Sequence, residues 1–590
     1  MASGFRYRLN AIQEKARLHG DADQHEQTDR WSNRDLIPLP PHRRTWGWFH
    51  FFGFWTIASL NITNWQIPST FLSTIPRFVK YVVLPARVVN LLSKAAQGLS
   101  VSQSMAVIVV ANLLIVGFST LVAWCGLKWH IGFTIQNRFT WGLRGSYLPL
   151  ALRVLLNFLW NAMQCWNGGR QVAVCLTAIW PRYATTMSGD NDFLPAGLRL
   201  VTTGGEFVGF VVFWFVSVPF LWLPPERFRI PFLVTSVWCG AGMLVMMVWS
   251  LAAAGGVGPL LHTGVAIPAG SRWSASWLMM GGVNQAIAGI TAGISNGSDF
   301  SRYAKGWRSY VVGSVSCGWV VGTLVSFVGL VTTSAAQVIY GQVYWNPPDL
   351  LLAMIDNGEG TRAARVGVFF LAFGFALASL FENMCGNVIA GGIDLAGLVP
   401  HYINIRRGAI ITFVAAWIIQ PWQLINRAST FVQVLSSFSV FLSPVIGLMA
   451  ADFYLVRGRQ VRLSHLYRTN DTIYWYWHGI NWRAFPSWVC GWAPTIGGLV
   501  VTVRQDPGAH RGLYQVNYMS FFIGFFTGGI IFYALNKLFP VGNLGEYDEV
   551  DIYGTFTPKE AEKLGVVPIE YQTEGFESLE TSALERSEKQ

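Results

Sequence analysis

Long apolar segments recur along the chain and alternate with short polar loops. Each segment approaches the roughly 20 residues that a helix needs to cross a bilayer. Hydrophobic residues make up 52% of the 590 residues and charged residues only 12%, whereas a soluble protein carries about a quarter charged residues. We therefore predict an all-α integral membrane protein with about twelve transmembrane helices. The predicted spans are 47–68, 103–126, 148–174, 204–223, 231–253, 276–296, 309–336, 364–392, 408–425, 430–455, 484–503 and 515–538.

The formal net charge of +11 comes from Lys and Arg in the short loops between these spans. Bases in alternate loops are typical of cytoplasmic loops, so both ends of the chain are predicted to be cytoplasmic. The predicted regions are an N-terminal tail (1–46), two five-helix repeats (47–253 and 276–455), two additional helices (484–538) and an acidic C-terminal tail (539–590). The C-terminal tail is expected to be flexible, with a short ordered piece as the alternative.

Polar side chains inside a span must find partners within the protein or line a cavity, because the bilayer core offers no water to hydrogen-bond them. The first span contains Asn61, Thr63, Asn64, Gln66 and Pro68. Proline removes a backbone donor, so we predict an interrupted helix whose freed groups face a cavity. Hydrogen bonding between neighbouring helices is the alternative.

The sixth span, 276–296, is rich in glycine and amides and is also predicted to be interrupted. The first and sixth spans occupy matching positions in two five-helix halves. A pair of interrupted helices in matching positions indicates a transporter site between inverted repeats. A glycine face used only for close helix packing is the alternative.

The third span places Trp160 and Gln164 four residues apart, on one helical face near the bilayer midplane. An indole plane beside an amide suits a flat heteroaromatic ring, which stacks on the indole and hydrogen-bonds the amide. A tryptophan that only packs against lipid or a neighbouring helix is the alternative.

The eighth span contains Glu382, Asn383 and Asn387. The two asparagines again lie four residues apart, and Glu382 is the most deeply placed carboxyl group of the predicted spans. A buried carboxyl group that changes its protonation suits a proton carrier. A structural pair with a neighbouring amide or base is the alternative. The other acids of the spans, Glu206, Asp394 and Asp452, are expected at interfacial water or at helix ends.

Several stretches, in order along nearly the whole chain, resemble the nucleobase:cation symporter family 1, and within it the fungal uracil, uridine and allantoin permease group. They are NRDLIPLPPHRRTWGWF, NITNWQIPST, WNAMQCWNGG, AIWPRY, NGSDFSRYAK, GGIDLAGLVPHYINIRRG, ADFYLVRGR, GINWRAFPSW and DIYGTFTPKEAEKLGV.

The resemblance implies a fold of five plus five inverted helices with two more appended, and alternating access to a central site. It also implies which residues bind the substrate. The ring is expected on Trp160, with hydrogen bonds from Gln164 and from Asn387 or Asn383. The resemblance further places Gln66, Gly289 and Ile290 at the pocket, and Leu435 and Phe438 at a gate at the start of the tenth helix.

The chain departs from the family pattern at three places. Sodium-coupled bacterial relatives carry hydroxyl ligands just before the first asparagine of the eighth helix, where this chain has Phe381 and Glu382. Phenylalanine supplies no oxygen ligand, so proton coupling is expected. Residues 74–97 resemble an insertion, which is either an unusual outer segment or an error of the gene model. The aromatic residue that often faces the substrate on the sixth helix is replaced by Ile290.

We therefore predict a plasma-membrane, proton-coupled transporter of a nucleobase-like heterocycle such as uracil, allantoin, uric acid or a nucleoside. Its partners are the small solute, a proton and the bilayer, and no nucleic acid, cofactor or metal is expected. The alternatives are a vitamin transporter for thiamine or nicotinamide riboside, and a sensor that does not transport. An enzyme is not expected, because the sequence shows no ligand cluster, nucleophile–base pair or phosphate loop.

Overall fold

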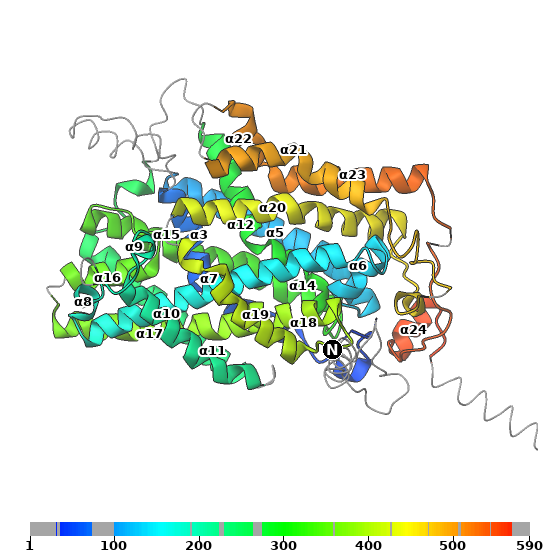
Figure 1. Cartoon of the computed structure of the whole chain (residues 1–590), viewed down its shortest axis with the longest axis horizontal. Coiled ribbons are helices and arrows are strands. Elements are labelled where there is room, and N and C mark those ends of the chain that lie inside the picture. The colour runs from blue at the N-terminus through cyan, green and yellow to red at the C-terminus, as the bar shows by residue number, and fades with distance from the viewer. Residues whose placement is uncertain are drawn as a thin grey trace, which may run out of the picture.

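The protein is described here by a computed structural model, which forms an elongated bundle of helices (Figure 1). The structure describes residues 31, 36–73, 99–188, 192–223, 229–263, 274–357, 360–424, 428–469, 471–504, 509–542 and 544–568. The predicted segment 74–97 lies outside them. Within the described residues, eight helices are long and apolar enough to cross a membrane.

Each predicted span corresponds to one helix or to consecutive helices. The first half contains α2 (Trp48–Ser59), α3 (Ile62–Ser73), α5 (Val101–Trp129), α7 (Tyr147–Ile179), α10 (Gly204–Ser217) and α11 (Arg229–Ala254). The second half contains α12 (Ala275–Ser295), α14 (Trp307–Val315), α15 (Gly322–Tyr340), α17 (Arg362–Glu382), α18 (Ile389–Leu398), α19 (Ile405–Ile419) and α20 (Ala428–Ala450). The two appended spans are α21 (Ala484–Arg504) and α23 (Ser520–Leu538), the latter preceded by α22 (Arg511–Tyr518).

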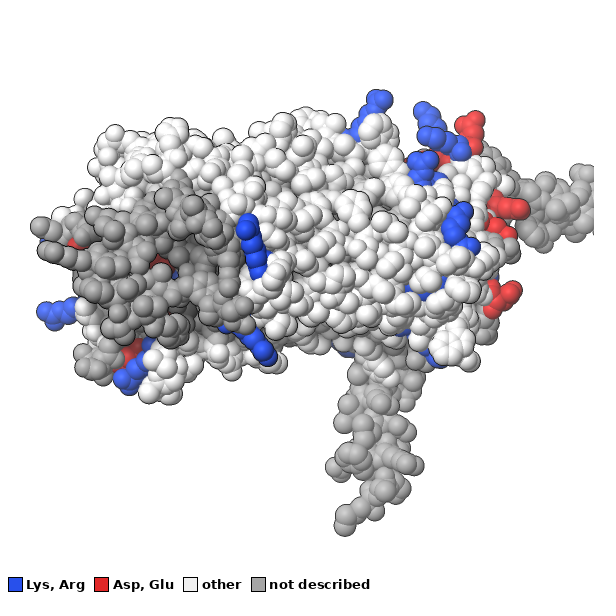
Figure 2. All heavy atoms as spheres, turned by 90° about the horizontal axis from the view of Figure 1, so that it is seen from above, with Lys and Arg blue, Asp and Glu red and all other residues white. Residues whose placement is uncertain are grey.

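Short helices cover the two ends of the bundle. Helices α6 (Phe133–Trp141) and α24 (Pro558–Leu564) lie at one end, which we call the α24 end. Helices α8 (Tyr183–Thr186) and α16 (Pro347–Asn357) lie at the opposite end (Figure 1). Charged side chains gather mostly near the α24 end and are sparse over the middle of the visible face (Figure 2), as expected of a surface that faces lipid.

The spans sort into two packed groups. In the first helix group, α12 packs on α5, α15 packs on α3 and α5, and α14 packs on α2. In the second helix group, α7 packs on α10, α17, α18 and α19. Helix α11 contacts both groups through α15 and α17, and α20 with α21 and α23 packs beside α12.

Glycine lets α7 and α10 approach closely inside the second helix group. A Cβ atom added at Gly209 would lie 2.3 Å from the carbonyl oxygen of Gly169, and one added at Gly169 would lie 2.4 Å from the Cα of Phe210. Backbones at this separation leave no room for side chains, as is common in membrane helix pairs.

The first span is broken, as predicted, between α2 and α3. Leu60 leaves helical geometry, and two asparagine side chains take up the freed backbone groups. Asn61 Oδ1 accepts from the Asn64 N–H (2.8 Å), and Asn61 Nδ2 donates to the Ala58 carbonyl (2.7 Å). Asn64 Nδ2 donates to the Ser59 carbonyl (2.9 Å). The break therefore precedes Pro68, which lies inside α3.

The sixth span differs from the prediction. Helix α12 continues through Gly289 and Ile290 to Ser295, and the chain departs from it only at Asn296 before the short α13 (Gly297–Ser301). The glycines of this span instead permit packing: a Cβ atom at Gly281 would lie 2.8 Å from the Tyr518 ring. The eighth span bends through a π-helical stretch, η8 (Asn383–Val388), between α17 and α18.

The C-terminal segment is folded up to residue 568. Arg44 Nη1 donates to both carboxylate oxygens of Glu560 (2.9 Å each) and contacts His130 Nε2 at 2.7 Å. Arg44 thus joins the segment before α2, the end of α5 and α24. This is the short ordered piece that the sequence left as the alternative to a wholly flexible tail.

Candidate functional site

A cavity of about 240 Å³ lies between the two helix groups, just below the usual range of small-ligand pockets. The broken first span, α5, α7, α12 and the region around η8 all contribute to its wall. The polar residues of the wall include Asn61, Thr63, Asn64, Asn112, Asn157, Trp160, Gln164, Asn296, Glu382 and Asn387.

Helix α7 contributes one continuous face to this cavity. Asn157, Trp160 and Gln164 follow each other at spacings of three and four residues, so they stack along the same side of the helix. The Trp160 ring lies 6.1 Å from the Phe438 ring at an interplanar angle of 52°. The predicted indole and the predicted amide thus line the same cavity, and an aromatic residue of α20 lies beside the indole.

Glu382 lies where the two helix groups meet at the cavity. Its Oε1 accepts from Asn61 Nδ2 and its Oε2 accepts from Gln164 Nε2, both at 2.7 Å. Gln164 Nε2 also contacts Thr63 Oγ1 at 3.3 Å, while the buried Gln164 Oε1 has no hydrogen-bond partner in the described structure. An unpaired buried amide oxygen is costly, and a ligand donor in the cavity would satisfy it.

The two asparagines of η8 differ in position. Asn387 lines the cavity, whereas Asn383 is fully buried behind it. Asn383 donates to Asn161 Oδ1 (3.0 Å) and accepts from Asn387 Nδ2 (3.0 Å). Asn387 is therefore open to the cavity, and Asn383 holds it from behind.

Gly289 and Ile290 line the cavity from α12. Gly386, on η8, faces open space, since a Cβ atom added there meets no other atom within 4 Å. Of the predicted gate residues, Phe438 is buried against Trp160. The Leu435 side chain lies outside the described residues, although its backbone belongs to α20.

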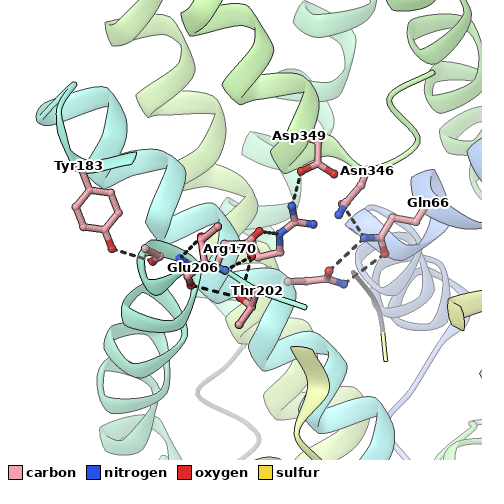
Figure 3. A network of polar contacts seen from close by, with 10 residues as sticks. Gln66, Arg170, Tyr183, Thr202, Glu206, Asn346 and Asp349 are labelled. Atoms are coloured by element: carbon pink, nitrogen blue, oxygen red, sulfur yellow. Dashed lines mark hydrogen bonds and ion pairs between the residues drawn. The ribbon is translucent and has the colours of Figure 1, made fainter. Parts of the chain in front are cut away.

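Gln66 does not line the cavity. Its side chain points to the end opposite α24, where Nε2 donates to Asn167 Oδ1 (3.1 Å) and Asn346 Oδ1 (2.9 Å) (Figure 3). The reason is its position on α3: Asn61 and Asn64 face the cavity at the break, while Gln66 projects toward α7 and α16.

The acids at the ends of the spans are paired. Arg170 bonds both Glu206 and Asp349, Arg457 bonds Asp452 (3.0 Å), and Arg153 bonds Asp394 (3.0 Å). Glu206 also caps α10, as expected. Asp394 and Asp452 are both buried, so the expectation of interfacial water was wrong for both, although Asp452 does follow the end of α20. A buried carboxylate is retained because an arginine compensates its charge.

Sequence reasoning missed several polar residues of the wall as site residues, among them Asn61 and Asn157. Asn157 lies three residues before Trp160, so the same helical spacing that selected Gln164 would have selected it. Asn61 belonged to the polar cluster of the first span, but only the position of the break shows which amide of that cluster reaches the cavity. Among the described residues, no group of three or more His, Cys, Asp or Glu lies close enough to hold a metal ion.

Comparison with known proteins agrees with this architecture. The computed structure aligns with the structure of Mhp1, a nucleobase-cation-symport-1 family transporter in a closed conformation with bromovinylhydantoin bound. The TM-score is 0.63 at 21% identity, over 90% of this chain and 98% of Mhp1. The chain therefore has the inverted-repeat transporter fold with two additional helices.

Sequence comparison assigns the family. Transporter aclS of Aspergillus oryzae is 30% identical, over 96% of both chains. The uridine permease of Saccharomyces cerevisiae is 30% identical over 89% of this chain and 79% of its own length, and the thiamine transporter THI72 of the same yeast is 29% identical over 91% and 84%. Residues 78–524 match the family described as permease for cytosine/purines, uracil, thiamine, allantoin. The chain is thus a multi-pass membrane protein that belongs to this nucleobase:cation symporter family of permeases.

Proposed function

We propose that the protein carries a nucleobase-like heterocycle across the plasma membrane together with a proton, and that both ends of the chain are cytoplasmic. The observation that carries this proposal is the shared cavity of Trp160, Gln164, Asn387 and Glu382. An indole face, two amides and a carboxyl group are the groups that a flat ring with amide and carbonyl edges needs.

In this proposal the ring lies on Trp160, between it and the α12 wall of Gly289 and Ile290. Gln164 and Asn387 hydrogen-bond the polar edge of the ring, and Asn383 holds Asn387 in place. Phe438 closes over the indole from α20; Leu435, on the same helix, is the second proposed gate residue. Glu382 takes up the proton, because its only described hydrogen-bond partners are the amides of Asn61 and Gln164.

A second substrate class is favoured by the same carboxyl group. Thiamine and nicotinamide riboside contain a positively charged aromatic ring, and relatives of this chain bear the names thiamine transporter and nicotinamide riboside transporter 1. A cationic ring over Trp160 and beside a charged Glu382 gains a cation–π contact and an ion pair. For such a solute Glu382 is a substrate ligand and no proton is required.

Uptake of radiolabelled uracil, uridine, allantoin, uric acid, thiamine and nicotinamide riboside decides between the two classes. The assay uses a host that lacks its own transporters for these compounds, with and without a proton uncoupler. Accumulation of a neutral heterocycle that the uncoupler abolishes supports the proposal. Accumulation of only the cationic compounds, thiamine or nicotinamide riboside, supports the second substrate class instead. Binding without flux for every compound identifies a sensor and overturns both.

A further inference from the structure

Helix α7 carries two buried arginines, one on each side of its cavity-lining face. Arg153 lies toward the α24 end and Arg170 toward the opposite end. They are 17 residues apart in sequence, which corresponds to about 25 Å along a helix. Asn157, Trp160 and Gln164 lie between them, so the two charges bracket the cavity wall.

Arg153 bonds carboxylates of both helix groups. Its Nη2 lies 3.0 Å from Asp394 on α18, in its own group, and its Nη1 lies 3.3 Å from Asp299 on α13, which follows α12 of the first group. Arg153 and Asp394 are at most 1% exposed, and Asp299 is 6% exposed. Asp299 also accepts from the Phe133 N–H at 2.8 Å. The contact with Asp299 therefore closes the α24 side of the interface between the groups.

Asn157 connects this ion pair to the cavity. It lines the cavity and its Nδ2 donates to Asp394 Oδ2 at 2.7 Å. The same carboxylate oxygen lies 3.0 Å from Arg153 Nη2. A ligand that draws the Asn157 amide toward itself weakens the hydrogen bond from Asn157 to Asp394. Arg153 then remains as the other contact of that carboxylate oxygen, and its position can change with it.

Arg170 forms the corresponding arrangement at the other side (Figure 3). It bonds Glu206 on α10, in its own group, at 2.8 Å, and Asp349 on α16. Helix α16 connects α15 to α17 and contacts α17 and α7 of the second group as well as α3 of the first. Asn346, just before α16, accepts from Gln66 of α3. The contact with Asp349 therefore joins α7 to the segment that links the two groups at the end opposite α24.

We propose that Arg153–Asp299 and Arg170–Asp349 are the inner and outer latches of the transport cycle, and that one opens while the other stays closed. The proposal rests on the proposed transport function. Each arginine keeps a second carboxylate inside its own group, Asp394 or Glu206, so an open latch leaves neither arginine unpaired. That arrangement removes most of the cost of breaking a buried ion pair.

The native Cys385 reports which latch is open. It lines the cavity, whereas Cys490 is exposed and the other five cysteines are buried. In a Cys490→Ser background, full-length protein is labelled with a membrane-impermeant thiol reagent, in intact cells and in inside-out vesicles, with Cys385→Ser as the blank. Asp299→Asn should raise labelling from the inner face relative to the outer face by about fivefold or more, and Asp349→Asn should change the ratio by a similar factor in the opposite direction.

Two matched controls remove a charge from the same arginines without crossing the interface. Asp394→Asn and Glu206→Gln remove the carboxylate that compensates the arginine of an open latch. Each should therefore favour the closed latch and shift the labelling ratio in the direction opposite to the crossing variant at the same arginine. If Asp299→Asn does not reach the membrane, Arg153→Lys serves instead, because a single ammonium holds two carboxylates less well than a guanidinium. It should shift the ratio in the same direction as Asp299→Asn.

Equal shifts for the crossing variants and their controls, or shifts of Asp299→Asn and Asp349→Asn in the same direction, overturn the latches. The labelling needs no solute, so it is independent of the substrate. The labelling ratio can shift in opposite directions in Asp299→Asn and Asp349→Asn while the protein takes up none of the tested compounds. That result supports the latches and rejects the proposed substrate. Normal uptake with unchanged labelling ratios rejects the latches alone.

Discussion

Asn61 Nδ2 lies 2.7 Å from Glu382 Oε1, so the amide that caps the broken first span also bonds the carboxyl group of the eighth span. Asn61 holds the start of α3 through its own oxygen. A change in the charge or position of Glu382 would therefore alter the hydrogen bonds of Asn61 at the helix break. This contact links the proposed proton site to the backbone of the first helix group.

Replacement of Glu382 tests the proton role. Glu382→Gln keeps a hydrogen-bonding side chain but cannot carry a proton through the cycle. Wild-type uptake should rise as the outside pH falls from 7 to 5, because the proton is a co-substrate that tightens solute binding. In Glu382→Gln we expect this pH dependence to vanish and accumulation to fall by about tenfold or more.

The control is Glu206→Gln, which removes a carboxyl group that is paired with Arg170 and does not line the cavity. Its uptake should keep the wild-type pH dependence. A pH profile that survives Glu382→Gln unchanged would clear Glu382 of the coupling role, and a raised KM for a cationic solute would indicate an ion-pairing role instead.

Removal of the indole tests the stacking surface. Trp160→Ala should reduce uptake by about tenfold or more, since an aromatic contact contributes about 0.5–1.5 kcal/mol beyond burial and the alanine also leaves the ring unsupported. Trp160→Phe should recover part of the activity. Trp180→Ala, at an exposed position beyond α7, is the control. Surface labelling must show all three variants at the membrane; normal uptake by Trp160→Ala removes the indole from the site.

Filling the cavity from its wall tests its location without removing a polar contact. Gly386→Val places two methyl groups into open space beside Asn387, so it should block solute binding with little effect on folding. Gly117→Val is the matched control, because Gly117 also has open space around it but lies outside the cavity wall on α5. We expect uptake to fall by about tenfold only in Gly386→Val, as one extra apolar group is worth about 1–3 kcal/mol in a fitted pocket. Similar uptake in both variants would place the solute elsewhere.

The docked C-terminal segment should withstand mild acid. Partial burial of Glu560 alone would raise its pKa, but contacts with His130, the Thr557 N–H and Arg44 hold the pKa well below its usual range. A carboxyl group with a lowered pKa stabilises the folded form above its ordinary pKa near 4.3, and that stabilisation is lost only as the pH falls further. Limited proteolysis should therefore cut the segment at equal rates at pH 7 and pH 5.

Glu560→Gln should expose the same segment to protease at both pH values. The neighbouring Glu562→Gln removes an exposed carboxyl group and serves as the control. Equal cleavage of both variants would show that Glu560 does not hold α24.

The parts of the fold that follow from local pattern were predictable. Apolar length located the spans, and helical spacing put Trp160 and Gln164 on one face. The break of the first span was predicted from its asparagines and Pro68, but it lies at the asparagines, and Pro68 stays inside α3. The pairing of Arg153 with Asp394 and Asp299 was not predictable, because these residues come from three distant segments and the contact depends on how the helix groups pack.

The sixth span and Gln66 show the same limit. Gly289 in a polar, glycine-rich stretch permits either a break or a close helix contact, and only the neighbouring helices decide between them. Gln66 and Asn61 belong to one polar cluster, yet a few residues along a helix turn one toward the cavity and the other toward α16.

The backbone contact between Gly169 and Gly209 fixes the orientation of the wall that meets the solute. Helices α7 and α10 touch there without intervening side chains, so a shift of one helix against the other would break this backbone contact. A methyl group added at either glycine would push the two helices apart and tilt the indole of Trp160. We therefore expect the selectivity of uptake to respond to variation at two residues that do not line the cavity.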